Sequence, residues 1–349
     1  MKRRGDARGR TLVAWRAVQT RARPSDGPRA PGWRGRLEVS PSQLDRIATA
    51  LVVSYALLVV TGGAVRLTGS GLGCADWPNC SRGDLIASAS FHPLVEFSNR
   101  CVTIAVSVVS IVAFLAALRR SPRRRDLVLL GTGVLAGLAA QVVLGGLVVL
   151  FKLNPYLVAL HFVLTLAVLA VAIALRHRNR HGSGRAQALV PRELIWLGRV
   201  QLGALSVLVL AGTMVTGAGP HAGGPGAKRI GVSFRDIAEL HADLALFLIG
   251  MSLATLFALH LGRAPAAVQR RARFFLEMLA VQGLLGYSQY FLHDAAGIVE
   301  LHLTGVTLLW CVMVAHYLAL YAHPVEKRAT PLAPAPAPSA AALGAAGTR

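Results

Sequence analysis

The chain has 349 residues, of which 54% are hydrophobic and 15% are charged, and its formal net charge is +21. Soluble domains average about 45–50% apolar and about 25% charged residues, so this composition excludes a water-soluble globular protein. Four cysteines are too few for a disulfide-rich scaffold. The basic residues lie between apolar runs, which favours a membrane surface over nucleic acid as their partner.

Eight apolar runs are long enough to cross a bilayer, for which about 20 residues are needed. Backbone polar groups in lipid must pair within their own segment, so each run is predicted to be a helix. In chain order the runs are 46–66, 100–118, 127–150, 156–176, 196–216, 240–261, 273–292 and 299–321. We therefore expect an all-α integral membrane protein with eight transmembrane helices.

Arginine clusters precede the first run and follow the second, fourth and sixth runs, and Lys327 and Arg328 follow the eighth, whereas the other loops carry few basic residues. The positive-inside rule then predicts a multi-pass protein of the cell membrane with both termini in the cytoplasm. The basic tail 1–45 is expected to be disordered and to lie near anionic lipid. The Pro/Ala-rich tail 323–349 is of low complexity and is also expected to be disordered.

The two halves of the chain share polar residues at matching places. Gln141 in the third run has a counterpart in Gln282 in the seventh, and His161 near the start of the fourth run has one in His302 in the eighth. We expect two repeat-related four-helix bundles, 46–176 and 196–322, joined by the cytoplasmic linker 177–195. Because each unit has an even number of spans, the units should share one orientation. Chance similarity between apolar helices is the alternative.

Three even-numbered runs carry a histidine near their predicted outer ends, namely His161, His241 and His302. Ionisable residues inside membrane spans are costly and are usually functional. Two imidazoles that face each other across a bundle suit an axial pair on heme iron. Their matching positions favour cofactor binding over three separate interfacial histidines.

Glu96 and Asn99 lie in the matching place at the start of the second span, just before its apolar run, and are three residues apart and so on one helix face. Arg100 follows, and a Glu96–Arg100 ion pair that anchors the helix end is the structural alternative to a catalytic carboxylate. His92 lies about two turns before Asn99 and by itself is typical of an ordinary loop histidine.

The outer loop after the first run holds Cys74 and Cys80 with five residues between them. Two thiols are too few ligands for a zinc site, and the outer compartment permits disulfides. We expect a disulfide here, either structural or redox-active.

Three motifs together resemble the heme A synthase family, in its bacterial type: GGAVRLTGSGLGCADWPNC at 62–80, EFSNR at 96–100 and GAGPHAG at 217–223. The resemblance covers about residues 45–322. It implies a membrane oxidoreductase that converts heme O to heme A by oxidising the C8 methyl group to a formyl group, for cytochrome oxidase biogenesis. It also implies that heme O synthase and cytochrome oxidase assembly factors are partners and that the protein contacts membrane lipid. A homo-oligomer is compatible with the resemblance.

The resemblance further implies a role for each candidate residue. His241 and His302 match the axial ligands of a stable heme b in the C-terminal half. His161 matches the ligand of the substrate heme in the N-terminal half, and Glu96 matches the catalytic carboxylate. Cys74 and Cys80 match an outer-loop pair that is linked to turnover or to transfer of electrons and heme.

Asn99 is a departure from the family pattern, in which many members have histidine at this place. Asparagine is a poor ligand for iron. Either His161 binds the substrate heme alone and leaves an open iron position, or His92 moves in as the second ligand. The later outer loop, 217–236, lacks the second cysteine pair of some relatives, so any thiol chemistry rests on Cys74 and Cys80.

Two other functions fit parts of the pattern. A b-type electron carrier would use the histidines but would leave Glu96 and the cysteine loop without a role, and its hemes would be expected on both sides of the membrane. A heme transporter or chaperone would fit the repeat, but no broken helix is evident at mid-membrane.

Overall fold

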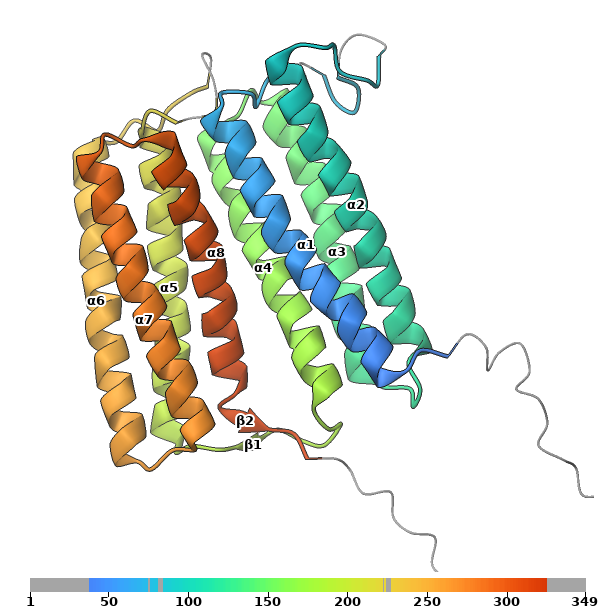
Figure 1. Cartoon of the computed structure of the whole chain (residues 1–349), viewed down its shortest axis with the longest axis vertical. Helices are drawn as coiled ribbons and strands as arrows, with labels where there is room; N and C mark the ends of the chain where they lie inside the picture. Colours follow the sequence, from blue (N-terminus) through green and yellow to red (C-terminus); the bar gives the residue numbers. More distant parts are fainter. Residues whose placement is uncertain (1–37, 75, 81–83, 222, 224–226, 325–349) are drawn as a thin grey trace, which may run out of the picture. The chain divides into compact units, whose positions relative to one another are not determined.

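The structure, a computed structural model, describes residues 38–74, 76–80, 84–221, 223 and 227–324. Residues 1–37 and 325–349, which hold most of the two expected tails, lie outside the described residues. Within the described part the chain forms eight helices and one pair of short strands (Figure 1). The helices are α1 (Pro41–Leu67), α2 (Phe91–Arg119), α3 (Arg125–Leu150), α4 (Pro155–Arg180), α5 (Arg192–Ala218), α6 (Phe234–Leu261), α7 (Ala266–Phe291) and α8 (Ala296–Leu318).

Every predicted apolar run lies mainly within one helix, and most helices begin or end beyond the run. The last run, 299–321, instead continues past the end of α8 at Leu318 and reaches β2 (Tyr321–Ala322). Seven of the helices are long and apolar enough to cross a membrane, which is consistent with a multi-pass membrane protein. The exception is α7, which is 26 residues long. Its first turns carry Arg270, Arg271, Arg273 and Glu277, and Gln282 interrupts its second half. These polar residues lower its hydropathy, so the membrane crossing of α7 stays a prediction.

Local capping explains where several helices begin. Ser40 and Gln43 form a reciprocal capping box at the start of α1, with Pro41 at the first helical position. The Asn154 side chain accepts the Tyr156 N–H at the start of α4. Ser233 accepts the Asp236 N–H at the start of α6. Side-chain oxygens thus satisfy backbone donors that the helix itself leaves unpaired.

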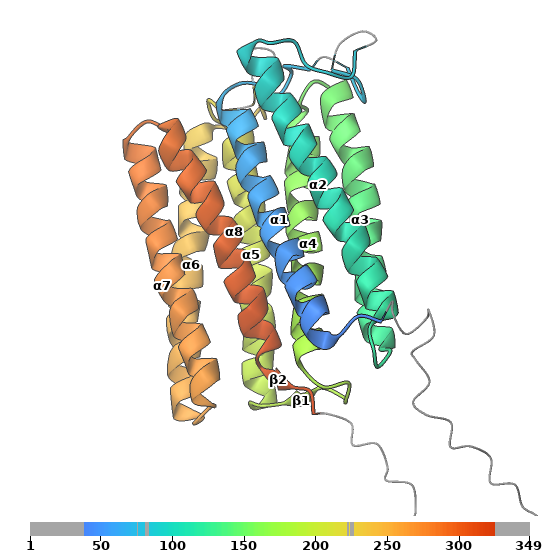
Figure 2. The ribbon, with the colours of Figure 1, turned by 45° about the vertical axis from the view of Figure 1, so that its right-hand side comes forward.

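The helices pack in two groups. Contacts join α1 with α2, α2 with α3, α3 with α4 and α4 with α1, and the same cyclic pattern joins α5, α6, α7 and α8. Between the groups, α8 contacts α1 and α4, and α4 contacts α5 (Figures 1 and 2). One buried apolar cluster has members in all eight helices. Large apolar side chains such as Phe247, Phe257 and Leu284 remain exposed, as a lipid-facing surface requires.

Ion pairs concentrate at the end of the helices where the arginine-rich loops lie, which we call the basic end. Asp126 pairs with Arg124 at 2.7 Å and with Arg178 at 2.9 Å. Asp45 accepts two hydrogen bonds from Arg180. These pairs tie the end of α4 to the starts of α1 and α3. The linker and the chain after α8 meet at the same end through β1 (Gln187–Ala188) and β2 (Tyr321–Ala322), which are antiparallel.

The close approach of α3 and α4 gives a test of this packing. A side chain at Gly137 would press into Val168 of α4. We expect Gly137→Leu to destabilise the fold by about 1–3 kcal/mol, the usual effect of overpacking. Thermal unfolding in detergent, followed by circular dichroism, measures this loss.

Gly250→Leu is the matched control, because nothing lies within 4 Å of a Cβ at Gly250. Equal melting temperatures for the two variants would contradict the described contact between α3 and α4.

Candidate functional site

His241 and His302 lie close together in the second group of helices. His241 lies on α6 and His302 on α8, with ring centroids 6.4 Å apart and ring planes at 72°. Nδ1 of His241 is 3.1 Å from the Leu208 carbonyl oxygen of α5, which leaves Nε2 as the nitrogen for another partner. Nδ1 of His302 is buried and has no hydrogen-bond partner among the described residues. Each of the two imidazoles therefore has at least one ring nitrogen that is available to bind a further partner.

Each of the three predicted histidines lies against a glycine of a neighbouring helix. A Cβ added at Gly212 would lie 3.0 Å from Cε1 of His241. The same construction gives 3.3 Å between Gly286 and His302, and 3.3 Å between Gly145 and His161. A methyl group at any of these positions would press on the ring, which would have to move by a few tenths of an ångström, so glycine is the residue that lets the three rings pack this closely against a neighbouring helix.

Two glutamines hold the histidine-bearing helices in place. Gln141 Nε2 donates to the His161 carbonyl oxygen at 3.1 Å and to Thr165 Oγ1 at 2.8 Å. Gln282 Nε2 donates to the His302 carbonyl oxygen at 2.8 Å. Both glutamines therefore bridge from the preceding helix to the backbone of the histidine itself. Such bonds fix the depth and rotation of the ring-bearing turn.

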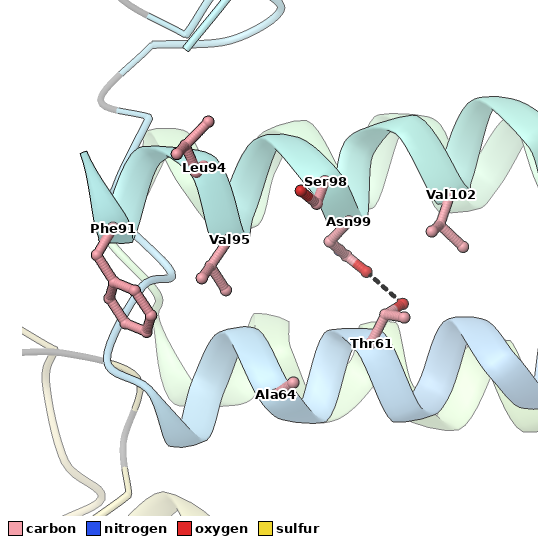
Figure 3. A pocket seen from close by; sticks show the side chains of 8 residues that line it. All are labelled: Thr61, Ala64, Phe91, Leu94, Val95, Ser98, Asn99 and Val102. Atoms are coloured by element: carbon pink, nitrogen blue, oxygen red, sulfur yellow. Dashed lines mark hydrogen bonds between the residues drawn. The ribbon is translucent and has the colours of Figure 1, made fainter. Parts of the chain in front are cut away.

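Asn99 of α2 is hydrogen-bonded to α1 rather than to another site residue. Thr61 Oγ1 donates to Asn99 Oδ1 at 2.7 Å (Figure 3). A cavity of about 320 Å³ lies between α1 and α2, and Thr61, Ala64, Val95 and Asn99 are among its lining residues (Figure 3). The structure thus places Asn99 beside open space, with its amide oxygen already engaged.

His92 is held by the loop that follows α1. Its Nδ1 is 2.9 Å from Ser70 Oγ, and its side chain lies in the first turn of α2 at an exposed position. A Cβ at Gly73 would press against the His92 backbone carbonyl, so the loop packs directly on this turn. The hydrogen bond to Ser70 gives His92 a role in joining the loop to α2.

Glu96 and Arg100 together hold the cysteine loop. Glu96 is only 5% exposed, accepts the Cys74 N–H at Oε2 (2.8 Å), and pairs through Oε1 with Arg100 Nη2 (2.6 Å). Arg100 also donates to the carbonyl oxygens of residues 76, 78 and 79. The predicted disulfide between Cys74 and Cys80 is confirmed. The ion pair considered as a helix anchor is therefore formed, and it positions the disulfide loop over α2.

Two ionisable residues, Arg66 and Glu300, were not identified from the sequence as site candidates. Their positions at the end of one apolar run and inside another indicate a possible functional role, because ionisable residues are costly in a membrane span. Arg66 of α1 donates to the backbone carbonyls of Thr216 and His221, and among the described residues it has no carboxylate partner. Glu300 of α8 has both oxygens buried without a hydrogen bond in the described part of the chain. Its carboxyl group faces Gly63 of α1. Both residues lie where the two helix groups meet.

A second histidine group lies at the basic end. The rings of His177 and His181 are stacked at 4.1 Å, and the ring of His323 lies 5.9 Å from that of His177. Burial and the charge of Arg178 lower the pKa of His323, so its ring is neutral near pH 7. No set of three or more His, Cys, Asp or Glu residues in the described ranges is arranged to hold a bare metal ion.

The helices, their apolar surface and the convergent imidazoles define a helical membrane-type protein with a candidate cofactor site. A model of the family described as cytochrome oxidase assembly protein, COX15-CtaA, matches residues 45–88 and 85–223. This is more than half of the chain, and the chain belongs to that family.

Several curated relatives are heme A synthases. The heme A synthase of Lysinibacillus sphaericus (strain C3-41) is 33% identical over 129 residues, which is 37% of this chain and 42% of that protein. That of Bacillus pumilus (strain SAFR-032) is 33% identical over 133 residues, 37% of this chain and 43% of that protein. That of Listeria welshimeri is 32% identical over 134 residues, 37% of this chain and 44% of that protein. The chain thus spans less than half the length of the curated relatives it matches.

The Arg100 contacts lead to a prediction about the disulfide loop. Arg100→Ala removes the donors from three loop carbonyls and leaves Glu96 without its cation, so the loop should open more often. We expect the Cys74–Cys80 disulfide to be reduced several-fold faster by a fixed concentration of thiol reagent. Alkylation of the released thiols at timed intervals, read by mass spectrometry, measures the rate.

Arg235→Ala is the control, because Arg235 forms an i,i+4 pair with Glu239 that is largely exposed. An unchanged reduction rate in Arg100→Ala would show that Arg100 does not restrain the loop.

Proposed function

We propose that this protein is a membrane oxidoreductase that converts heme O to heme A by oxidising the C8 methyl group to a formyl group, for cytochrome oxidase biogenesis. The close pair of His241 and His302 is the observation that carries the proposal. It occurs in a chain that belongs to a cytochrome oxidase assembly family and has relatives named heme A synthase. The two groups of four helices are proposed to be repeats, each with one heme site.

The geometry of the histidine pair fits a heme. Metal–nitrogen bonds of about 2 Å on the two faces of one ion, plus roughly 1 Å from each nitrogen to its ring centre, place axial imidazole centres about 6 Å apart. The observed separation is 6.4 Å. No further His, Cys, Asp or Glu joins the pair within the described residues. A porphyrin, which brings its own four nitrogen donors, matches a site that offers only two protein ligands.

His241 and His302 are therefore proposed to hold a resident heme b. The Leu208 carbonyl next to His241 Nδ1 fixes that ring, and Gln282 fixes the turn that carries His302. A heme bound there would supply a centre for electron transfer. A hydrogen bond to the ring nitrogen that does not bind the metal orients a ligating imidazole and sets its tautomer.

The N-terminal half is proposed to bind the substrate, heme O. His161 is its proposed iron ligand, since its Nδ1 is buried without a partner in the described part of the chain and Gln141 holds its backbone. The cavity beside Asn99 provides open space in this half, at the end of the helices opposite the basic end.

Glu96 is proposed to accept a proton released as the methyl group is oxidised. Each carboxylate oxygen has two acceptor positions, and the bonds from Cys74 and Arg100 occupy one on each. A remaining position can accept from a hydroxyl group or water. The Cys74–Cys80 disulfide, which Glu96 touches through the Cys74 N–H, is proposed to take part in electron or heme transfer.

The orientation in the membrane is also a proposal. The disulfide lies at the end opposite the basic end, and disulfides persist in oxidising compartments. Both termini are then cytoplasmic, and the histidines and the cysteine loop lie near the outer side. Heme O synthase and cytochrome oxidase assembly factors are the proposed partners.

The central test is extraction of pigment from protein produced in a host that supplies heme O and an electron donor. We expect heme b and heme A in the extract. Glu96→Gln should retain the resident heme spectrum and lose at least tenfold in heme A, because the amide cannot accept the proton. Chromatography of the extracted hemes measures both quantities.

Glu239→Gln, which alters an exposed Glu–Arg pair, should leave heme A unchanged. Resident heme without heme A in the unaltered protein would favour an electron carrier or a heme transporter instead. Full activity in Glu96→Gln would reduce Glu96 to a positioning residue of the loop.

The resident heme should depend on its two proposed ligands. We expect His302→Ala to abolish the absorption bands of the C-terminal heme, whereas His161→Ala should keep them and lose heme A. His260→Ala is the control, because His260 is exposed near the basic end of α6. An unchanged spectrum in His302→Ala would rule out the proposed axial pair.

A further inference from the structure

Trp77 of the disulfide loop lies with one face of its indole ring on the backbone of α3. A Cβ added at Gly146 would lie 3.1 Å from both Cδ2 and Cε2 of Trp77 and 3.3 Å from Cε3. Because Cδ2 is an inner atom of the fused ring, so short a distance to it means that the face of the indole covers Gly146. Gly146 is buried, whereas Trp77 is 42% exposed. The ring therefore covers α3 on one side and leaves its other side open.

The backbone on both sides of Trp77 is held in place by Arg100 of α2. Its guanidinium group donates to the carbonyl oxygen of Asp76 at 3.1 Å, and to those of Pro78 at 3.2 Å and Asn79 at 2.9 Å. The disulfide between Cys74 and Cys80 closes the loop around the same segment. One polar and one covalent restraint thus present the indole to α3.

The turn of α3 that Trp77 covers also packs on His161. Gly145 directly precedes Gly146, and a Cβ there would lie 3.3 Å from Cε1 of His161. One turn earlier, Gln141 donates to the His161 carbonyl oxygen. Residues 145 and 146 lie in one hydrogen-bonded helical turn, so a displacement of one moves the other. Contacts therefore run without a break from Trp77 through α3 to the His161 ring.

We propose that Trp77 is a positioning residue that joins the disulfide loop to the turn of α3 beside His161. Glu96 and Arg100 hold the loop on α2, and Trp77 holds it on α3. The proposed proton acceptor, Glu96, and the proposed iron ligand, His161, are thereby connected through one set of contacts. This inference rests on the proposed function for the roles of those two residues, whereas the contacts themselves do not depend on it.

An anchor in the lipid headgroups is the other role open to an indole at a helix end, because tryptophan is favoured at the boundary between membrane and water. A ring that serves only as an anchor faces lipid and can be removed without effect on the helix interior. The Trp77 ring instead covers a buried residue of α3. The two roles therefore differ in what happens at His161 when the ring is removed.

The chemical reactivity of His161 tests the proposal without reference to catalysis. Diethyl pyrocarbonate adds an ethoxycarbonyl group to a neutral imidazole nitrogen that it can reach, and mass spectrometry of peptides gives the rate at each histidine. The full chain is used as purified in detergent, without added heme O. Trp77→Ala should raise the rate at His161 several-fold, because the turn of α3 is no longer held. Trp77→Phe should keep the original rate, because its ring can still lie on Gly146.

Two comparisons separate positioning from a general loosening of the structure. His302 lies in the other group of helices, so its rate should not change in Trp77→Ala. Trp196→Ala removes another half-exposed indole, at the start of α5, and should leave the His161 rate unchanged. Equal acceleration at His161 and His302 would overturn the proposal. An unchanged His161 rate in folded Trp77→Ala would also overturn it and would leave Trp77 as a lipid anchor.

Gly146→Leu approaches the same contact from the side of α3. Its side chain would take the place of the indole, so His161 should again react faster, and this variant carries the test if Trp77→Ala does not fold. Melting temperatures check the folding of each variant. In the double variant, Gly146→Leu should add nothing to the effect of Trp77→Ala, because both remove one contact. Additive effects would show that Trp77 acts by another route and would overturn the proposal.

The outcomes are separable from those of the proposed function. Faster modification of His161 in Trp77→Ala, in a protein that forms no heme A, would support the positioning role and count against the enzyme. Heme A formed by a protein in which Trp77→Ala leaves His161 unaffected would overturn the positioning role and leave the enzyme assignment standing. Where both hold, heme A formation should fall several-fold in Trp77→Ala and be restored in Trp77→Phe.

Discussion

Space beside the helix backbone is the constraint on which the site depends. An imidazole that points into a group of tightly packed helices meets the neighbouring helix at once, and a side chain there would displace it. Gly145, Gly212 and Gly286 remove that side chain at the three histidines. Because helices in lipid associate by close packing rather than by the hydrophobic effect, such a gap is costly unless a ring fills it. Glycine and histidine therefore act as one structural unit at each position.

The disulfide end of the structure is organised by charge. Glu96 is almost fully buried, yet its charge is balanced by Arg100 and by a backbone N–H. A buried carboxylate without such partners would be strongly unfavourable. The same pair holds the loop that carries the disulfide, so any change at Glu96 is transmitted to Cys74. A proposed catalytic group and a proposed redox group are thus in direct contact in the N-terminal half.

The two groups of four helices share some side-chain contacts and differ in others. Both have a glutamine that bridges to the histidine backbone and a glycine beside the ring. Only the C-terminal half brings two imidazoles together, whereas the N-terminal half pairs Thr61 with Asn99.

Hydropathy in the sequence was enough to predict the eight helices, because each apolar run is long and uncharged. The spacing of Cys74 and Cys80 was enough to predict the disulfide. The ends of the helices were predicted less well, because polar residues extend several helices beyond their apolar runs. Polarity predicted the histidines, Glu96 and Asn99, but spacing along one helix shows only which residues share a face. The tertiary structure decided which residue bonds to Asn99 and which glycine lies beside each imidazole ring. It also decided that Arg66 and Glu300 lie between the helix groups. Each depends on the rotation of helices that are remote in sequence, and interhelical packing alone sets that rotation.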